Sequence, residues 1–226
     1  CEEVIDATGC YLLPGIIDDH VHFRDPGLTH KADILTESRA AAAGGVTSIM
    51  DMPNTNPLTV TLDALNAKLD LLNEKCIVNH SCYFGATNNN YTEFDKLDKH
   101  RVCGIKLFMG SSTGNMLVDK MNSLLNIFNG TDMLIAAHCE DQETIKNNIE
   151  KYKQKYKGAD DIPVSAHPSI RSVPACYASS ELAVRLAKIA GARLHILHVS
   201  TAKELQLFSD EPLANKNITA EACVAH

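Results

Sequence analysis

The stretch YLLPGIIDDHVHFRDPG, residues 11–27, decides which fold this sequence predicts. Its apolar run ends at His20 and His22, and Arg24 follows two residues later. Because side chains alternate between the two faces of a strand, His20 and His22 point to the same side and can bind one metal ion together. Two histidines at this spacing are also common in structural roles, so the pair alone leaves both interpretations open.

Further apolar runs follow the first one, and segments with apolar residues at helical spacing separate them. The strand candidates are residues 11–22, 46–54, 77–86, 103–110, 133–139, 193–200 and 218–226. The helix candidates are residues 31–45, 61–75, 91–100, 120–128, 140–156, 180–191 and 201–208. One long irregular segment, residues 157–176, is polar and contains prolines, so we predict a loop there.

Alternating strands and helices are typical of a parallel sheet with crossover helices. The number of repeats favours an α/β fold of the TIM type, a (β/α)8 barrel. An open doubly wound sheet is the second choice, and the lack of a glycine-rich phosphate loop after the first strand weakens it. The last strand candidate ends at His226 and is the seventh, so we expect a barrel that is truncated before its last strand.

Composition narrows the class of ligand. The net charge of −7, without a long basic run, argues against nucleic acid or an anionic membrane as the main partner and favours a small molecule. No apolar stretch approaches the roughly 20 residues that span a bilayer, and the first residues lack the pattern of a signal peptide. We therefore expect a cytoplasmic protein. The eight scattered cysteines include no CxxC pair and are expected to be free thiols.

Polar residues close most of the strand candidates. In a barrel, sites are built where strands end and the following loops begin, so these residues should converge at one mouth. They are Asp51 and Asn54 in the second candidate, Lys106 in the fourth, His138 in the fifth, His198 in the sixth and His226 in the seventh. A satisfied core histidine is the alternative for each histidine, and a structural role for His226 stays equally open.

The remaining histidines receive structural or solvated roles. His195 shares a strand candidate with His198, and their offset of three residues predicts opposite faces, so only one can face the site. We choose His198 because it lies nearer the carboxyl end. The others lie in predicted loops or helices and are His30, His80, His100 and His167.

Lys106 is unusual because it lies inside the apolar run GIKLFMG, residues 104–110. Burying an unpaired ammonium group there costs several kcal/mol. An ion pair with an Asp or Glu, or an outward path of the side chain, would remove that cost. A third possibility is that the neutral amine reacts with carbon dioxide and forms a carbamate, an anion that can bridge two cations.

Five motifs occur in order along the chain. They are PGIIDDHVHFRDPG at 14–27, DMPNTNP at 51–57, GIKLFMGSSTG at 104–114, HCED at 138–141 and HVST at 198–201. With these motifs the chain resembles the cyclic amidohydrolases of the amidohydrolase superfamily and, within them, the dihydroorotases. The resemblance extends through almost the whole chain and implies a barrel of the metal-dependent hydrolase type.

The resemblance also implies a site with two zinc ions. His20 and His22 would bind one zinc, His138 and His198 the other, and a carboxylated Lys106 would bridge them. Arg24 and Asn54 would hold the substrate carboxylate, and a guanidinium can do so through two hydrogen bonds. Without the resemblance, Arg24 would be assigned an ion pair with Asp25 or Asp19, and Asn54 a turn.

The implied activity is the reversible, zinc-dependent hydrolysis of (S)-dihydroorotate to N-carbamoyl-L-aspartate in de novo pyrimidine biosynthesis. In the family, an Asp at the end of the eighth strand carries the proton to the leaving nitrogen, and we expect this catalytic residue beyond residue 226. Residues 1–13 look like the tail of a small N-terminal β domain, and residues 14–226 like the incomplete barrel. We expect such a segment to be poorly stable or inactive alone.

Two alternatives remain. Allantoinases and dihydropyrimidinases share the paired histidines and the lysine, but Arg24 and Asn54 favour a substrate with a carboxylate. A non-catalytic homologue that acts as an assembly partner is the second alternative, and the intact set of ligands argues against it. Analogy alone adds a homodimer as a candidate assembly.

Overall fold

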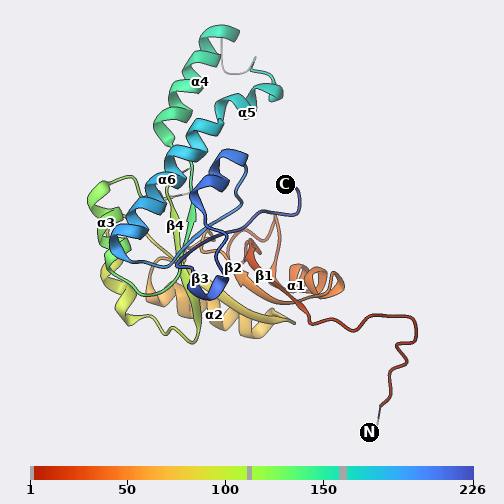
Figure 1. Ribbon diagram of the computed structural model, residues 1–226. Helices are drawn as coiled ribbons and strands as arrows, with labels where there is room; N and C mark the ends of the chain where they lie inside the picture. The colour runs from red at the N-terminus through yellow and green to blue at the C-terminus, as the bar shows by residue number, and fades with distance from the viewer. Residues whose placement is uncertain (1–2, 111–113, 158–161) are drawn as a thin grey trace.

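The structure is a computed structural model that describes residues 3–110, 114–157 and 162–226. Within these ranges one parallel sheet contains seven strands, and their order in space equals their order in the chain (Figure 1). The strands are β1 Ile16–Val21, β2 Val46–Asp51, β3 Asn79–Gly85, β4 Val102–Phe108, β5 Ile135–His138, β6 Leu194–Ile196 and β7 Ile218–Ala220. A sheet wound in this order is the arrangement of a (β/α) barrel, because a doubly wound sheet reverses its order at a switch point. The predicted fold class is confirmed.

Helices follow most of the strands. The α-helices are α1 Ile34–Ala43, α2 Leu62–Lys75, α3 Met121–Asn129, α4 Gln142–Tyr156, α5 His167–Ile170 and α6 Val173–Ala190. Short 3-10 helices are η1 Tyr91–Lys96, η2 Val164–Ala166, η3 Ala202–Leu207 and η4 Leu213–Asn215. Side chains of Asp33, Thr61 and Asp141 accept hydrogen bonds from the first turns of α1, α2 and α4, which explains where these helices begin.

The prediction of a loop over residues 157–176 was wrong in part. Residues 158–161 lie outside the described residues, but the rest of the segment contains η2, α5 and the first residues of α6. Both α5 and α6 carry a proline in their first turn, where no backbone N–H is needed for the helix. The prolines that suggested a loop therefore mark the beginnings of helices.

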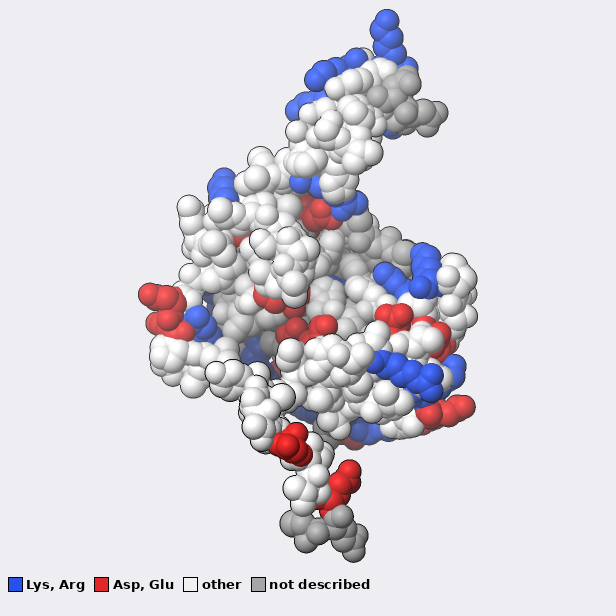
Figure 2. Space-filling view, turned by 90° about the vertical axis from the view of Figure 1, so that its right-hand side faces the viewer, with Lys and Arg blue, Asp and Glu red and all other residues white. Residues whose placement is uncertain are grey.

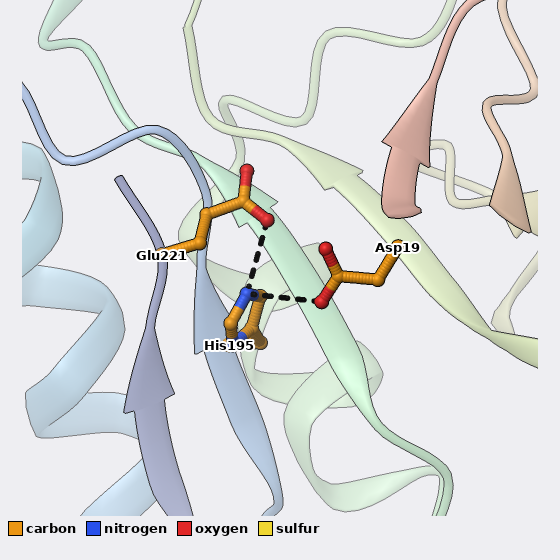
Figure 3. Close-up of side chains that lie close together, drawn as sticks. All are labelled: Asp19, His195 and Glu221. Carbon is orange, nitrogen blue, oxygen red and sulfur yellow. Dashed lines mark hydrogen bonds and ion pairs between the residues drawn. The ribbon is translucent and has the colours of Figure 1, made fainter. Parts of the chain in front are cut away.

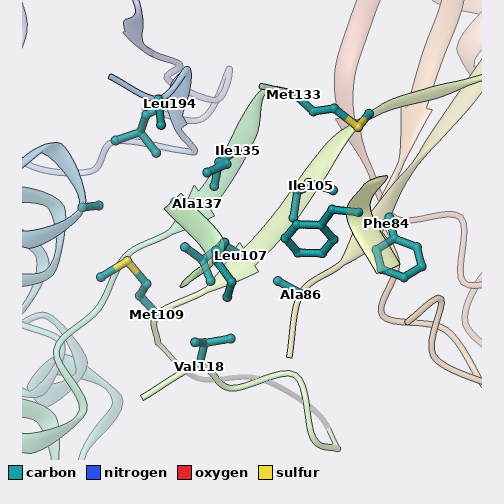
Figure 4. Close-up of a cluster of buried hydrophobic side chains, with 14 of the residues drawn as sticks. Phe84, Ala86, Ile105, Leu107, Met109, Val118, Met133, Ile135, Ala137 and Leu194 are labelled. Carbon is teal, nitrogen blue, oxygen red and sulfur yellow. The ribbon is translucent and has the colours of Figure 1, made fainter. Parts of the chain in front are cut away.

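The main core lies between the sheet and the helices (Figure 4). In β4, Ile105 and Leu107 point into this core and are fully buried. Because neighbouring residues of a strand face opposite sides, Lys106 points to the other, concave face of the sheet. A smaller apolar cluster that includes Tyr83 and Ala136 forms part of that inner face. The inner face therefore holds both the apolar layer and the polar site.

The two ends of the sheet are the edge strands β1 and β7. Before β1, the described residues 3–15 form no helix or strand and extend away from the sheet (Figure 1). The division at residues 13 and 14 into a small β domain and a barrel stays a prediction. In the described residues no helix has the length and apolar character that crossing a membrane requires.

Candidate metal centre

Four histidine rings lie in a row at the carboxyl ends of β1, β5 and β6. The ring centroids of His22 and His20 are 5.3 Å apart, and those of His20 and His198 are 5.4 Å apart. His138 follows, with its centroid 4.8 Å from that of His198. The structure thus brings together all four histidines that the sequence singled out as metal ligands.

Protein groups hold one ring nitrogen in three of these histidines. Nδ1 of His22 lies 2.8 Å from Oδ1 of Asn54, and Nδ1 of His20 lies 2.5 Å from Oε1 of Glu221. Nε2 of His138 lies 3.0 Å from Oε2 of Glu140. Because each acceptor takes the proton of one ring nitrogen, the opposite nitrogen keeps its lone pair, which is the state that binds a metal.

The facing nitrogens of His138 and His198 lie at one end of the row. Nδ1 of His138 lies 2.9 Å from Nε2 of His198. With Nε2 of His138 donating to Glu140, its Nδ1 carries a lone pair that points at the second ring. Two imidazoles in this arrangement share a proton or present two lone pairs to one cation. The donor chemistry of this pair therefore fits zinc.

Burial keeps two of the rings neutral. It lowers the pKa of His22 to about 3, and the nearby charges of Arg24 and His20 act in the same direction. Burial also lowers the pKa of His198 to about 4, with further contributions from His138 and Lys106. Neutral imidazole is the form that coordinates a metal, so both rings are in the binding form at neutral pH.

Lys106 is 1% exposed, so an outward path of its side chain is excluded. Burial lowers its pKa to about 7, and its Nζ lies 4.4 Å from the centroid of the Phe108 ring. No Asp or Glu among the described residues forms an ion pair with it. Its charge lowers the pKa of both His22 and His198, so the amine lies within electrostatic reach of both histidine pairs.

Arg24 has neither of the two ion-pair partners that were considered for it. Asp25 instead pairs with Lys75, whose Nζ lies 3.0 Å from Oδ2 of Asp25. Oδ2 of Asp19 lies 3.8 Å from Nε2 of His195. Arg24 itself is half-buried and adopts a left-handed backbone with φ 64°. Among the described residues, its guanidinium forms no salt bridge, and its charge acts on His22.

A buried ion pair anchors the loop that carries Arg24. Nζ of Lys68 lies 2.8 Å from Oδ2 of Asp51, and both side chains are fully buried. Oδ1 of Asp51 accepts from the backbone N–H of Phe23, the residue before Arg24, and from that of Met52. Asp51 was expected among the polar residues at the strand ends, and the structure gives it this supporting role. Lys68 was missed, although its position on the buried face of α2 with Leu65 and Leu72 is a visible signal.

Asn54 lies at the site, but its side-chain oxygen contacts His22. The sequence did not suggest this contact, and the contact of Asn54 with a substrate carboxylate stays a prediction. His226 lies at the rim, where its Nδ1 is 3.0 Å from the carbonyl oxygen of Val199.

Glu140 belongs to the HCED motif, and the sequence alone did not predict its contact with His138. Hydrogen bonds from His138 and Arg171 lower its pKa to about 2, although burial alone would raise it. A side chain at Gly110 would meet Cβ of Glu140 at 2.9 Å, so the glycine permits this close approach. The missed signal is the carboxylate two residues after His138. A cavity of about 190 Å³ beside His138 and His198 is also lined by Glu140 and Arg171.

The prediction that His195 and His198 face opposite sides was wrong. Strand β6 ends at Ile196, and His198 has a left-handed backbone with φ 38°, so the alternation of a strand does not reach it. His195 and His198 both contact Glu221, through the ring of His195 and the backbone N–H of His198. His195 therefore lies on the same inner side, with Asp19 and Glu221 (Figure 3).

A groove of about 790 Å³ lies between the two edge strands. Its lining includes His20, His22, His198 and Glu221. Figure 2 shows a hollow in the molecular surface with acidic side chains in and around it. Burial and the charge of Glu221 raise the pKa of Asp19, which lies on this groove.

Comparisons with known proteins identify the family of this chain. Residues 9–204 match the sequence profile of a family described as "Dihydro-orotase-like". The dihydroorotase of Listeria innocua is 32% identical over 99% of this chain and 51% of its own length. The dihydroorotase of Methanosphaera stadtmanae is 32% identical over 100% of this chain and 50% of its own. The chain therefore spans about half the length of the curated relatives that it matches.

Solved structures of cyclic amidohydrolases are also similar. L-hydantoinase (dihydropyrimidinase) from Arthrobacter aurescens superposes with a TM-score of 0.87 at 29% identity, over 96% of this chain and 49% of that one. Dihydropyrimidinase from Brevibacillus agri gives a TM-score of 0.81 at 25% identity, over 98% of this chain and 49% of that one.

Proposed function

The chain belongs to the dihydroorotase-like family, and we propose that the protein carrying it is a zinc-dependent dihydroorotase. The observation that carries the proposal is the row of four histidines beside a half-buried Arg24 that has no carboxylate partner among the described residues. The histidines supply the ligands for a metal, and the guanidinium supplies the charge that a carboxylate substrate needs.

The proposed ligands are His20 and His22 for one zinc ion, and His138 and His198 for a second. A carboxylated Lys106 would bridge the two ions. The low pKa of Lys106, about 7, supports this assignment because the neutral amine is the form that adds to carbon dioxide. In that reaction a bond forms between Nζ and the carbon of carbon dioxide, and one proton leaves to solvent. The chemistry that zinc supplies when bound is Lewis-acid activation of water and of the amide carbonyl.

The protein's own residues orient the reactants. Arg24 would bind the substrate carboxylate through two hydrogen bonds and so turn the ring amide toward the histidines. Asn54 holds the ring of His22 through Nδ1, and Glu140 holds the ring of His138 through Nε2. These contacts fix which nitrogen of each ring faces the site. We also propose a substrate contact for Asn54, as the resemblance implies.

A dihydropyrimidinase is the second candidate, and the similarity to the hydantoinase structures favours it. Cyclic ureides such as dihydrouracil lack the carboxylate, so Arg24 separates the two candidates. Turnover of dihydroorotate, measured beside allantoin and dihydrouracil, decides between them. Turnover of allantoin or dihydrouracil alone would identify the protein as an allantoinase or a dihydropyrimidinase. No turnover of any of the three substrates would favour a non-catalytic assembly partner.

Replacing Arg24 by alanine tests the carboxylate contact. We expect Arg24→Ala to lower kcat/KM for dihydroorotate about 30- to 150-fold, the loss that follows from removing about 2–3 kcal/mol of charged hydrogen bonding. Zinc content should not change. Arg24→Lys is the matched control, because it keeps the charge without the paired geometry and should lose less. Unchanged kcat/KM in Arg24→Ala would contradict the assignment.

Turnover of dihydroorotate would connect the protein to pyrimidine biosynthesis. The cytoplasm is the compartment that we propose, on the composition of the chain, and a dimer is the assembly that analogy suggests.

A further inference from the structure

We propose that Glu221 is a positioning residue that orients two of the candidate metal ligands, His20 and His198, which come from opposite ends of the sheet. The inference rests on the metal role that the proposed function gives to these histidines. Glu221 immediately follows β7, one edge strand, whereas His20 lies in β1, the other edge strand. One carboxylate therefore connects the two edges at the site.

The contacts of Glu221 are specific for each oxygen atom. Oε1 lies 2.5 Å from Nδ1 of His20 and also accepts from the backbone N–H of His198 at 3.0 Å. Oε2 lies 3.3 Å from Nε2 of His195 (Figure 3). The proton of His20 is thereby held on Nδ1, and Nε2 is left to face the site.

The backbone of Glu221 is itself fixed. Its N–H donates to the carbonyl oxygen of Ile196 at 3.0 Å, and its carbonyl oxygen accepts from Val199 at 2.8 Å. These bonds hold Glu221 beside the turn that contains His198. A carboxylate on such a rigid support can fix the ring of His20 within a narrow range of directions.

His198 needs this support because of its backbone. Its φ of 38° lies in the left-handed region, which residues other than glycine rarely adopt without compensating contacts. The hydrogen bond from its N–H to Oε1 of Glu221 is one such contact. The same oxygen atom therefore fixes the tautomer of His20 and the turn that directs His198 toward His138.

A separate cation site at Asp19, His195 and Glu221 is the competing interpretation, since their ligand atoms lie within 4.8 Å of one another. The hydrogen bonds favour positioning. Nε2 of His195 faces the carboxylates of Glu221 at 3.3 Å and Asp19 at 3.8 Å, which accept hydrogen bonds, so this nitrogen carries the proton and has no lone pair for a cation. Both oxygens of Glu221 are engaged as well.

The test compares Glu221→Ala and Glu221→Gln in the protein that carries this chain. Asp19→Asn is the matched control, because it removes a charge from the same cluster without a hydrogen bond to His20. The first readout is the ring tautomer of His20 in the metal-free protein, from long-range 1H–15N NMR spectra. The second is zinc affinity, measured by competition with a chelator.

We expect Glu221→Ala to abolish the preference for a proton on Nδ1 of His20 and to weaken zinc binding about 10- to 100-fold. Glu221→Gln keeps an acceptor oxygen and should retain the tautomer with a smaller loss of affinity. It also keeps the test decisive if Glu221→Ala does not fold. Asp19→Asn should leave the tautomer unchanged and zinc affinity within about twofold.

An unchanged tautomer and zinc affinity in folded Glu221→Ala would overturn the inference. An equal loss of zinc affinity in Asp19→Asn would also overturn it, because a general charge effect would then explain the result. Neither readout requires turnover. A protein that binds zinc but hydrolyses no dihydroorotate would therefore refute the proposed function and leave the role of Glu221 to be judged separately.

Discussion

His198 combines a buried ring with a left-handed backbone, and its burial makes the metal-free protein sensitive to acid. The pKa of His198 falls from its ordinary value of 6.5 to about 4 in the folded protein, first through burial and then through the charge of His138. Between these two pH values the unfolded chain binds a proton that the folded chain does not. Folding stability from this residue is therefore present above pH 6.5 and is lost as the pH falls toward 4.

Urea unfolding of the metal-free protein at neutral pH and near pH 4 tests this prediction. His198→Asn removes the titrating ring, so the stability difference between wild type and variant should be smaller at the acidic pH. His100→Asn, at an exposed position, is the control and should show no such change. A difference for His198→Asn that is the same at both pH values would contradict the prediction.

Lys106 gives a prediction about carbon dioxide. Because burial brings the pKa of Lys106 to about 7, a large fraction of the amine is neutral and reactive near neutral pH. We expect zinc retained after dialysis to rise when bicarbonate is added to a carbon dioxide-depleted buffer. Lys106→Met should bind less zinc and show no response to bicarbonate. If the wild-type protein retains the same amount of zinc with and without bicarbonate, the result would argue against the carbamate.

At the scale of elements, the ion pair of Asp51 and Lys68 joins α2 to the ends of β1 and β2. Both side chains are fully buried, and Lys68 also donates to the carbonyl oxygen of Met52 at 2.5 Å. Lys68→Met leaves the carboxylate of Asp51 buried without its counter-charge, so we expect a loss of about 3–5 kcal/mol in the free energy of unfolding. Denaturant titration measures it.

Two further variants sharpen this test. Lys99→Met removes a lysine of the same kind from its pair with Asp132, but the two side chains are 55% and 75% exposed, so the loss should stay below about 1 kcal/mol. The double variant Asp51→Asn with Lys68→Met should recover part of the lost stability. Equal effects of Lys68→Met and Lys99→Met would show that burial of the first pair does not matter.

The sequence predicted the elements better than their boundaries. Apolar spacing located α1, α2, α3 and α4, and the glycine at 191 ends α6 with φ 67°, as a C-cap glycine does. Residues 91–100 and 201–208 were expected to be helical and contain only the short 3-10 helices η1 and η3. A periodic pattern over so few residues cannot distinguish the two kinds of helix, because the tertiary contacts decide it.

The grouping of the four histidines could be predicted because they lie at the ends of strands. Histidines that close buried strands stand out in a sequence, and all four lie together. The carboxylates that hold them, Glu140 and Glu221, do not stand out, because acidic residues in loops are common and their partners lie far away in the sequence. The contact between His20 and Glu221 joins residues 201 positions apart. Only the folded sheet shows it.

At the scale of the whole molecule, the order of the strands explains why the site has its shape. Winding from β1 to β7 in sequence places the first and last strands at the two edges, and the concave face between them carries the histidines. The groove between these edges is lined by His20, His22 and His198. Glu221, directly after β7, contacts His20 of β1 and so joins the two edges at the site.

The most direct measurement is the rate of dihydroorotate ring opening by the protein that carries this chain, before and after removal of metal. We predict that a chelator abolishes turnover and that about two equivalents of zinc restore it, because two histidine pairs and Lys106 form the proposed centre. Dihydrouracil and allantoin should be turned over far more slowly. Turnover that persists after the metal is removed, or zinc-loaded protein that does not open dihydroorotate, would contradict the account.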